Sequence, residues 1–192
     1  MGYADNRMVS AVRILPGLPP YGPMPMAFPP EWGHLGREGT VVEFTTDEGV
    51  WVGNFQPGLG GLQFAGLHPN EVDVVVIAAG DLWVVNTNEK TAFRTLPALE
   101  GILEVHNPEG WILSRQGLAL ARLGPKGLMW HTRRLSWDGF DQLHIVQDEL
   151  RGLAWSPIDD KWCAFSVELN TGKSTGGSYF PDDVEGWETL SS

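Results

Sequence analysis

The residues best suited to chemistry in this chain lie in the stretch RRLSWDGF, residues 133–140. Two arginines, a tryptophan and an aspartate fall within six positions, and they are Arg133, Arg134, Trp137 and Asp138. Tryptophan and arginine are the types most enriched where proteins bind one another. A second tryptophan, Trp155, follows shortly before the turn at 157–160. These five residues are the candidate binding residues.

A purely structural interpretation of the same stretch is also available, and we expect it to be the stronger. Leu135 and Trp137 alternate with polar neighbours, and this period of two is typical of a strand with one buried face. Asp138-Gly139 is a common turn pair, so Phe140 should begin the next strand. The stretch is therefore predicted to be a strand and a turn, with binding as the alternative.

Catalytic and metal-binding patterns are not found elsewhere in the sequence. The nucleophile elbow, the zinc-protease helix motif and the phosphate-binding loops are all missing. The glycines in PGLGG (57–61) lack the lysine and the following helix that would cradle a phosphate, so they predict a turn. The five histidines do not share metal-ligand spacing. We therefore predict no catalytic residue, no metal and no cofactor, although a constellation assembled only in three dimensions stays possible.

The nine tryptophans divide into two predicted groups. Those inside apolar strands should form core, and they are Trp83, Trp111, Trp130 and Trp162. Those beside turns or acidic residues could be exposed and offer a flat platform, and they are Trp32, Trp155 and Trp187. The lone cysteine, Cys163, lies in the apolar run WCAF and is predicted to be a small core residue.

Half of all prolines lie between Pro16 and Pro30. Proline fixes φ and removes a backbone donor, which excludes helix and central strand. Large apolar residues are distributed through the segment, so we expect residues 1–37 to form an extended strap packed on the body. A proline-rich ligand for another domain is the alternative. Residues 38–180 should form the main domain, and residues 181–192 an acidic tail.

Short strands separated by glycine- or aspartate-marked turns fill the main domain. GTVVEFTTDEGVWVGNF (39–55) predicts a hairpin about 46–49. Three later units, 72–96, 110–137 and 150–178, share one plan, with first turns near residues 80, 116 and 159. A spacing of roughly 36 to 43 residues is near that of propeller blades. We expect an all-β, propeller-like stack of three to four antiparallel blades, open or closed into a small ring. Open sheet edges would be covered by the strap or by a homodimer.

The repeated segments resemble the blades of PQQ-type and related bacterial β-propellers, especially the strand, turn, strand segments at 81–95 and 162–178. The phrases VRILPGLPPYGP (12–23), VGNFQPGLGGL (52–62) and LSWDGF (135–140) are similar to short bacterial proteins without an assigned role. The likeness to PQQ-type propellers implies a propeller-like fold, and it does not imply that the chain binds the PQQ cofactor. The likeness to the short bacterial proteins implies no activity and brings no catalytic residues.

The net charge of −11 makes nucleic acid and anionic membranes poor partners. No run approaches the length of a membrane helix, and no secretion signal is recognised, so we expect a cytoplasmic protein. The favoured function is a non-enzymatic protein–protein interaction module, such as an immunity or inhibitor-type protein acting by surface complementarity. The alternative is a small-molecule or carbohydrate binder with a pocket lined by tryptophan and arginine at a blade end.

Overall fold

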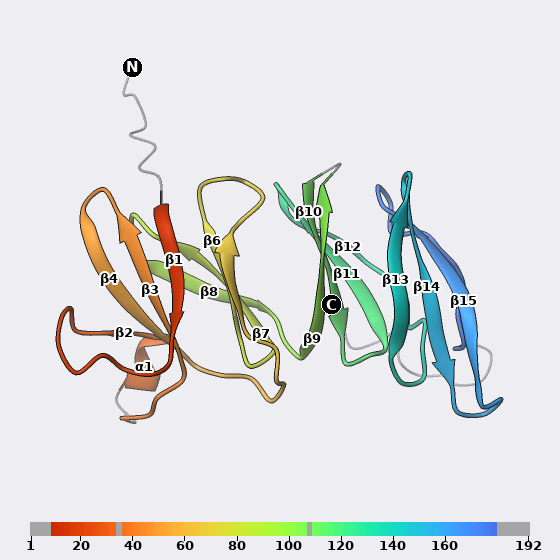
Figure 1. Cartoon of the computed structure of the whole chain (residues 1–192), viewed down its shortest axis with the longest axis horizontal. Coiled ribbons are helices and arrows are strands. Elements are labelled where there is room, and N and C mark those ends of the chain that lie inside the picture. Colours follow the sequence, from red (N-terminus) through yellow and green to blue (C-terminus); the bar gives the residue numbers. More distant parts are fainter. Residues whose placement is uncertain (1–8, 34–35, 107–108, 180–192) are drawn as a thin grey trace, which may run out of the picture. The chain divides into compact units, whose positions relative to one another are not determined.

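The computed structural model describes residues 9–33, 36–106 and 109–179. The described chain is all-β, as predicted, with four sheets of four strands and one short helix (Figure 1). The first sheet has the order β1 (Val9–Leu15), β3 (Thr40–Thr46), β4 (Gly49–Phe55), β2 (Met26–Phe28). The helix α1 spans Pro30–Gly33. In this sheet β2 pairs with β4 in parallel, while β1, β3 and β4 pair antiparallel.

The other three sheets are meanders, in which strands adjacent in sequence are adjacent in space. The second comprises β5 (Phe64–Leu67), β6 (Val74–Ala78), β7 (Asp81–Asn86) and β8 (Thr91–Leu96). The third comprises β9 (Leu99–His106), β10 (Glu109–Arg115), β11 (Ala119–Gly124) and β12 (Gly127–His131). The fourth comprises β13 (Phe140–Val146), β14 (Glu149–Ser156), β15 (Lys161–Glu168) and β16 (Ser174–Gly176).

The predicted hairpins of the main domain are confirmed. β3 and β4 join at residues 47–48, β6 and β7 at Ala79-Gly80, and β14 and β15 at 157–160. Gly80 adopts a φ of +89°, a conformation that favours glycine, and this tight turn allows Val76 and Trp83 to pair across the strands. Local turn chemistry therefore sets the register that decides which side chains share a face.

The chain divides into two compact units. Unit 1 comprises Met1–Leu113 with Leu123–Gly127, and unit 2 comprises Ser114–Arg122 with Leu128–Ser192.

Aromatic side chains dominate the core of unit 1. Phe44 and Trp51, paired across β3 and β4, stack with ring centroids 4.2 Å apart. Phe55 stacks on Phe28 at 5.0 Å and lies 5.9 Å from Trp83 of the second sheet. Fully burying one such side chain stabilises the fold by about 1.5–3 kcal/mol. These rings and the valines of β6 and β7 join the first two sheets through one apolar cluster.

Residues 9–33 of the predicted strap supply both edge strands of the first sheet. Against the expectation of no helix, one helical turn begins at Pro30, because proline is tolerated in the first turn. β1 lies against β3, and the three residues of β2 lie against β4, before α1 buries Trp32. Phe28 is also buried, whereas Tyr21 and Met24 are almost fully exposed. The segment is therefore packed at its ends, and its middle is a loop that projects from the sheet. The predicted tail, 181–192, lies outside the described residues.

A buried arginine lies in the core of unit 2. Arg122 is only 2% exposed, and its Nη1 donates to the Leu169 carbonyl at 2.5 Å. The Trp130 indole Nε1 donates to the same carbonyl at 2.7 Å. Burial lowers the pKa of Arg122 from its ordinary value. The shared carbonyl fixes the end of β15 against β11 and β12.

Candidate functional site

Arg134 packs against two aromatic rings in unit 2, Trp137 and Tyr179, which also contact each other edge to face with centroids 4.9 Å apart. Its guanidinium carbon lies 4.8 Å from the centre of the Trp137 ring and 4.4 Å from that of Tyr179. Its Nε donates to the Ser136 carbonyl at 2.9 Å, and its Nη2 to the Trp137 carbonyl at 3.0 Å. A planar guanidinium can stack and donate in its own plane at once. Arg134 thus holds the 134–137 turn closed on itself.

Arg133 reaches instead to the segment that follows β16. Its Nη2 donates to the Gly176 carbonyl and its Nη1 to the Tyr179 carbonyl, both at 2.8 Å. The Ser178 and Tyr179 amides in turn donate to the Leu135 carbonyl at 2.8 and 3.3 Å. The chain after the last strand is therefore tied to 133–137 by side chains and backbone together.

Two serines complete this cluster, which we call the clasp (Arg133, Arg134, Ser136, Trp137, Ser178 and Tyr179). Ser136 is fully buried, and its Oγ donates to the Gly139 carbonyl at 2.6 Å. The Trp155 carbonyl accepts from the Ser178 Oγ at 2.5 Å and from the Trp137 amide at 3.2 Å. The clasp therefore fixes the position of Trp155 on β14.

The strand predicted for RRLSW is wrong. Residues 132–136 have no regular secondary structure, and β12 ends at His131. Leu135 and Ser136 are consecutive and both buried, so the predicted alternation of faces is not present. The reason is that its backbone bonds are divided: the Thr132 amide donates to Leu120 of β11 and the Leu135 amide to Leu118, while the Leu135 carbonyl accepts from the 178–179 segment, so no continuous ladder forms. The predicted start of β13 at Phe140 is confirmed.

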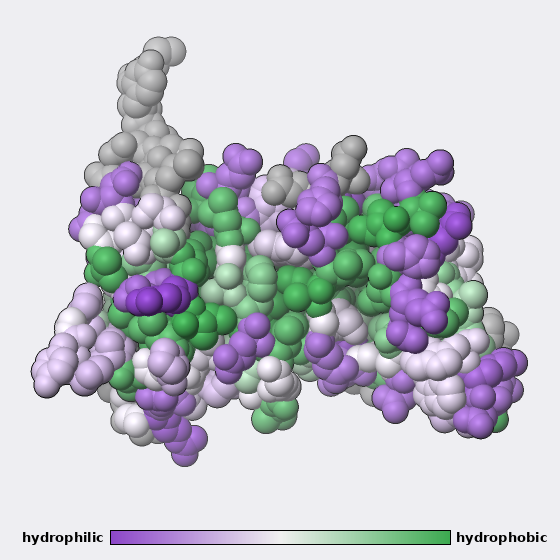
Figure 2. Space-filling view, viewed as in Figure 1, coloured by the Kyte–Doolittle hydropathy of each residue, from purple (hydrophilic) through white to green (hydrophobic). Residues whose placement is uncertain are grey.

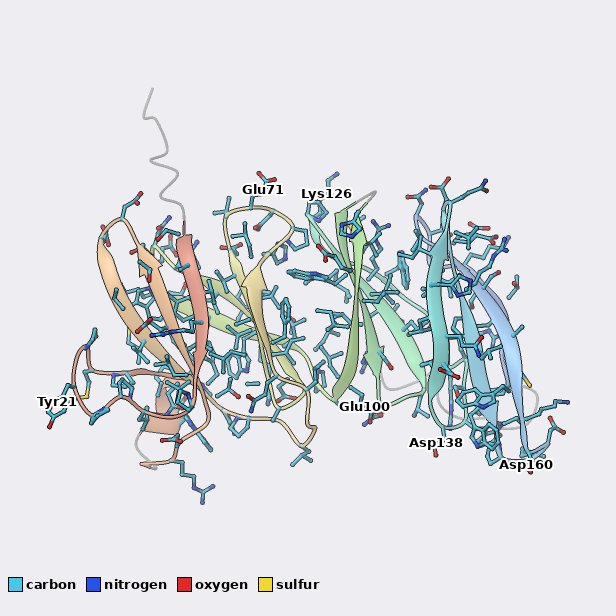
Figure 3. The ribbon with its side chains drawn as sticks, viewed as in Figure 1. Tyr21, Glu71, Glu100, Lys126, Asp138 and Asp160 are labelled. Atoms are coloured by element: carbon cyan, nitrogen blue, oxygen red, sulfur yellow. The ribbon has the colours of Figure 1, made fainter. Side chains whose placement is uncertain are left out.

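The five predicted binding residues do not form one open site. Arg133, Arg134 and Trp137 belong to the clasp, where the arginines donate to backbone carbonyls. Asp138 is exposed and lies, like Asp160, at one end of the fourth sheet (Figure 3). Trp155 alone projects from a strand onto an open face. Its surroundings identify the candidate site.

The fourth sheet has one buried and one exposed face. On β15, Phe165 and Val167 are buried and Cys163 is half-buried, whereas the alternate residues Trp162 and Ala164 are exposed. Cross-strand pairing places β14 residues opposite them on the exposed side. We call this side the Trp155 face. Its apolar half consists of Leu153, Trp155, Trp162 and Ala164, and its polar half of Glu149, Arg151, Ser166 and Glu168.

Two tryptophans form the centre of the apolar half. Trp155 pairs directly with Trp162 across β14 and β15, and the rings lie 5.2 Å apart at an angle of 59°. Trp162 is 43% exposed, although it contacts another large ring. Ile158, in the turn between the two strands, is also exposed. The hairpin therefore presents a rigid aromatic pair to its surroundings.

Charges in the polar half are paired locally. Glu149 and Glu168 face each other across the strands, which would be repulsive without partners. Arg151 donates to the Glu149 carboxylate at 2.8 and 3.0 Å, and the Thr171 hydroxyl donates to Glu168 at 2.8 Å. These exposed contacts are individually weak. Arg151 balances Glu149, whereas Glu168 is bonded only to a neutral hydroxyl here, so the polar half is hydrogen-bonding and mildly acidic.

Two tryptophan predictions are wrong, and one signal was overlooked. Trp162 was predicted in the core but is exposed, and Trp32 was predicted to be exposed but is buried. In KWCAFSVE, Trp162 has the same parity as Ser166 and Glu168, which marks the solvent side. Trp83 and Trp130 are buried, as predicted, whereas Trp111 and Cys163, also predicted in the core, are only half-buried. Trp187 lies outside the described residues.

His68 is the one histidine in the described ranges that is buried, and its role is structural. Its Nδ1 accepts the Asn70 amide at 3.0 Å, within the turn that leads into β6. Burial lowers the pKa of His68, against smaller opposing effects of Asp73 and Asn70. Across residues 9–33, 36–106 and 109–179, His, Cys, Asp and Glu side chains do not gather into a group of three that could hold a metal ion.

The comparisons with known proteins identify no family. No family model matches the chain. A search of curated proteins finds no significant match. Among the described residues, no helix is long and apolar enough to cross a membrane.

Proposed function

We propose that the protein is a non-catalytic binding module that docks a partner protein on the Trp155 face. The observation that carries the proposal is the Trp155–Trp162 pair, in which the exposed Trp162 lies 5.2 Å from the half-buried Trp155 on the open side of the fourth sheet. Tryptophan at the centre of an interface is a frequent source of binding energy. A pair already fixed by two strands loses little side-chain entropy when a partner binds.

The composition of the Trp155 face supports a protein partner. An apolar half next to a hydrogen-bonding half matches the apolar core and polar rim of protein interfaces. A sheet face is broad and flat, which suits another protein surface more than a small molecule that needs a concave site. The paired charges of the polar half would then contribute to orientation and specificity.

The charge of the whole chain favours a basic partner. A net charge of −11 attracts a positively charged protein over long distances and accelerates encounter at low salt. An immunity or inhibitor-type protein, which acts by covering a basic target, fits this description. The expected signature is an association rate that falls steeply as salt is raised, with a smaller change in dissociation rate.

We also propose that the four sheets are arranged as the blades of a propeller-like assembly. Three of the four are sequential meanders, and the first differs in taking β1 and β2 from the predicted strap, on either side of the Pro16–Pro25 loop. An open arrangement would leave an unpartnered sheet face, and the Trp155 face would then be a natural site for a second protein. A second copy of this chain is one outcome of the test below.

Affinity capture with a matched pair of variants tests the proposed function. Trp162→Thr removes one ring of the pair and keeps a residue that favours strands. Phe93→Thr is the control: it also replaces an exposed aromatic residue by threonine on a strand, at the 62%-exposed Phe93 of β8 in unit 1. Immobilised protein is mixed with lysate of the producing organism, and bound proteins are quantified by mass spectrometry. We expect a stoichiometric partner that Trp162→Thr loses and Phe93→Thr retains.

A carbohydrate is the second candidate ligand, and the same tryptophan pair favours it. Exposed indole rings can stack on sugar rings, as aromatic side chains do with other apolar surfaces. A glycan array separates the two functions. Binding of an oligosaccharide that is lost in Trp162→Thr, with no protein captured, would replace the protein-binding proposal. Retention of the captured partner by Trp162→Thr would refute the role of the Trp155 face.

A further inference from the structure

The loop between β1 and β2 exposes an unusual amount of apolar surface. Tyr21 is 90% exposed and Met24 88%, and Leu18 and Met26 are also exposed. The Tyr21 side chain points away from the ribbon at the outer end of the loop (Figure 3). Isolated apolar residues at a surface are ordinary, but four within nine positions form an apolar patch, and such patches are typical of interaction sites.

The loop is stiffened and tied at its base. Five of the ten residues from 16 to 25 are proline, and each fixes its own φ. Gly22 has a φ of +107°, which reverses the chain beside Tyr21. At the base, the Leu18 amide donates to the Glu38 carboxylate at 3.1 Å. A loop restrained in this way pays less entropy on binding than a flexible one.

Charge distinguishes the loop from the rest of the chain. No charged residue occurs between Arg13 and Glu31, in a chain with 37 charged residues, 13 basic and 24 acidic. In Figure 2 the loop is drawn in pale colours, without the saturated purple of charged side chains. A surface that binds this loop would therefore need apolar contacts and no compensating charges.

We propose that the loop Pro16–Met26 is a second docking element, which inserts Tyr21 and Met24 into an uncharged, apolar pocket of a partner protein. Tyrosine supplies a large rigid ring, and methionine adapts its shape to the pocket. The loop belongs to unit 1 and the Trp155 face to unit 2, so each can be tested without the other. With both surfaces the protein would join two partners, as an adaptor does.

A lipid surface is less suitable than a protein pocket. Segments that lie on membranes usually carry lysine or arginine next to their apolar residues, to contact anionic headgroups. The loop itself contains no lysine or arginine, the residue that bonds to its base is the acidic Glu38, and the whole chain is acidic. Vesicle binding is therefore an outcome of the test that would overturn the proposal.

The test compares two serine variants of the full chain. Tyr21→Ser combined with Met24→Ser removes the two exposed tips. Leu59→Ser is the control, because Leu59 is a fully exposed apolar residue of the same unit. Proteins captured from lysate of the producing organism are quantified with and without a synthetic peptide of residues 14–27 as competitor. Both variants change exposed side chains, and equal melting temperatures would verify that folding is unaffected.

We expect a captured protein that the peptide displaces and that the double variant binds at least about tenfold less, with Leu59→Ser unchanged. If the amount of captured protein is the same with the peptide present and with the double variant as bait, the proposal is overturned. Flotation of the wild-type chain with phosphatidylcholine vesicles, abolished by the double variant, would overturn it in favour of a lipid surface. Trp162→Thr is tested in parallel and should still capture the protein that the peptide displaces. This outcome would distinguish binding through the loop from the binding proposed for the Trp155 face.

Discussion

Replacing Arg134 with lysine should destabilise the protein without a comparable loss of partner binding. Lysine keeps the charge, but it cannot donate in a fork to the Ser136 and Trp137 carbonyls while packing a flat guanidinium against the Trp137 and Tyr179 rings. Because the site is half-buried, we expect the lost hydrogen bond to cost about 1 kcal/mol of stability. Each of the two weakened ring contacts should cost about 0.5 kcal/mol more. The free energy of unfolding should therefore fall by about 2 kcal/mol.

A change of about 2 kcal/mol should lower the melting temperature by about 4–8 °C in a chain of this length. Scanning calorimetry measures it, and Arg151→Lys is the matched control. Arg151 contacts only an exposed carboxylate in the described structure, so its replacement should cost less than about 1 kcal/mol.

Hydrogen exchange should locate the effect of Arg134→Lys in the clasp. The amides of Ser178 and Tyr179, which donate to Leu135, should exchange faster, and those of β6 and β7 should not change. Equal melting temperatures for the Arg134→Lys and Arg151→Lys variants would refute the structural role of the clasp. An unchanged melting temperature together with lost partner binding would restore Arg134 as a binding residue.

Two further changes test the packing of each unit. Gly172→Ala should destabilise unit 2 by about 2–4 kcal/mol, because Gly172 has a φ of +73° and a Cβ there would press on Trp130. Gly139→Ala is the control, because Gly139 also has a positive φ but open space around it, so its cost in urea unfolding should be clearly smaller. Equal costs for the two variants would contradict this packing. Burial lowers the pKa of His68 below its ordinary value of 6.5, so as pH falls the unfolded chain takes up the proton first and stability is lost below about pH 6.5. His68→Gln should reduce the drop in melting temperature between pH 7.5 and 5.5, and a drop as large as in the wild type would refute the assignment.

The strands and turns could be predicted from the sequence because their signals are local. Asp-Glu-Gly at 47–49 and Ala-Gly at 79–80 mark tight turns, and short valine-rich runs on either side are typical of strands. These features depend on residues within a few positions of one another. They predicted the all-β class and a hairpin in each of the four sheets.

The clasp could not be predicted in this way, because its partners are distant in the sequence. Arg133 bonds to carbonyls 43 and 46 positions further along the chain, and Trp137 contacts Tyr179. The pattern of RRLSW looks like a strand until those partners are known. The pairing of β1 with β3 across the proline-rich loop is non-local for the same reason.

The Trp155 face was predicted only in part. Trp155 was among the candidate binding residues, but its neighbour Trp162 was assigned to the core. Hydrophobicity favours burial of tryptophan, whereas the parity of β15 places Trp162 with Ala164 and Ser166 on the exposed side. In this strand the period-two pattern is a better guide than the residue type.

The most direct test of the binding function is the affinity of the captured partner for two purified variants. Calorimetric titration would compare the dissociation constants of the wild type, Trp162→Thr and Phe93→Thr. If the tryptophan pair is the centre of the interface, Trp162→Thr should weaken binding by about 30-fold or more, which corresponds to about 2 kcal/mol. Phe93→Thr should stay within about twofold of the wild type. Equal dissociation constants for all three proteins would contradict the assignment of the Trp155 face.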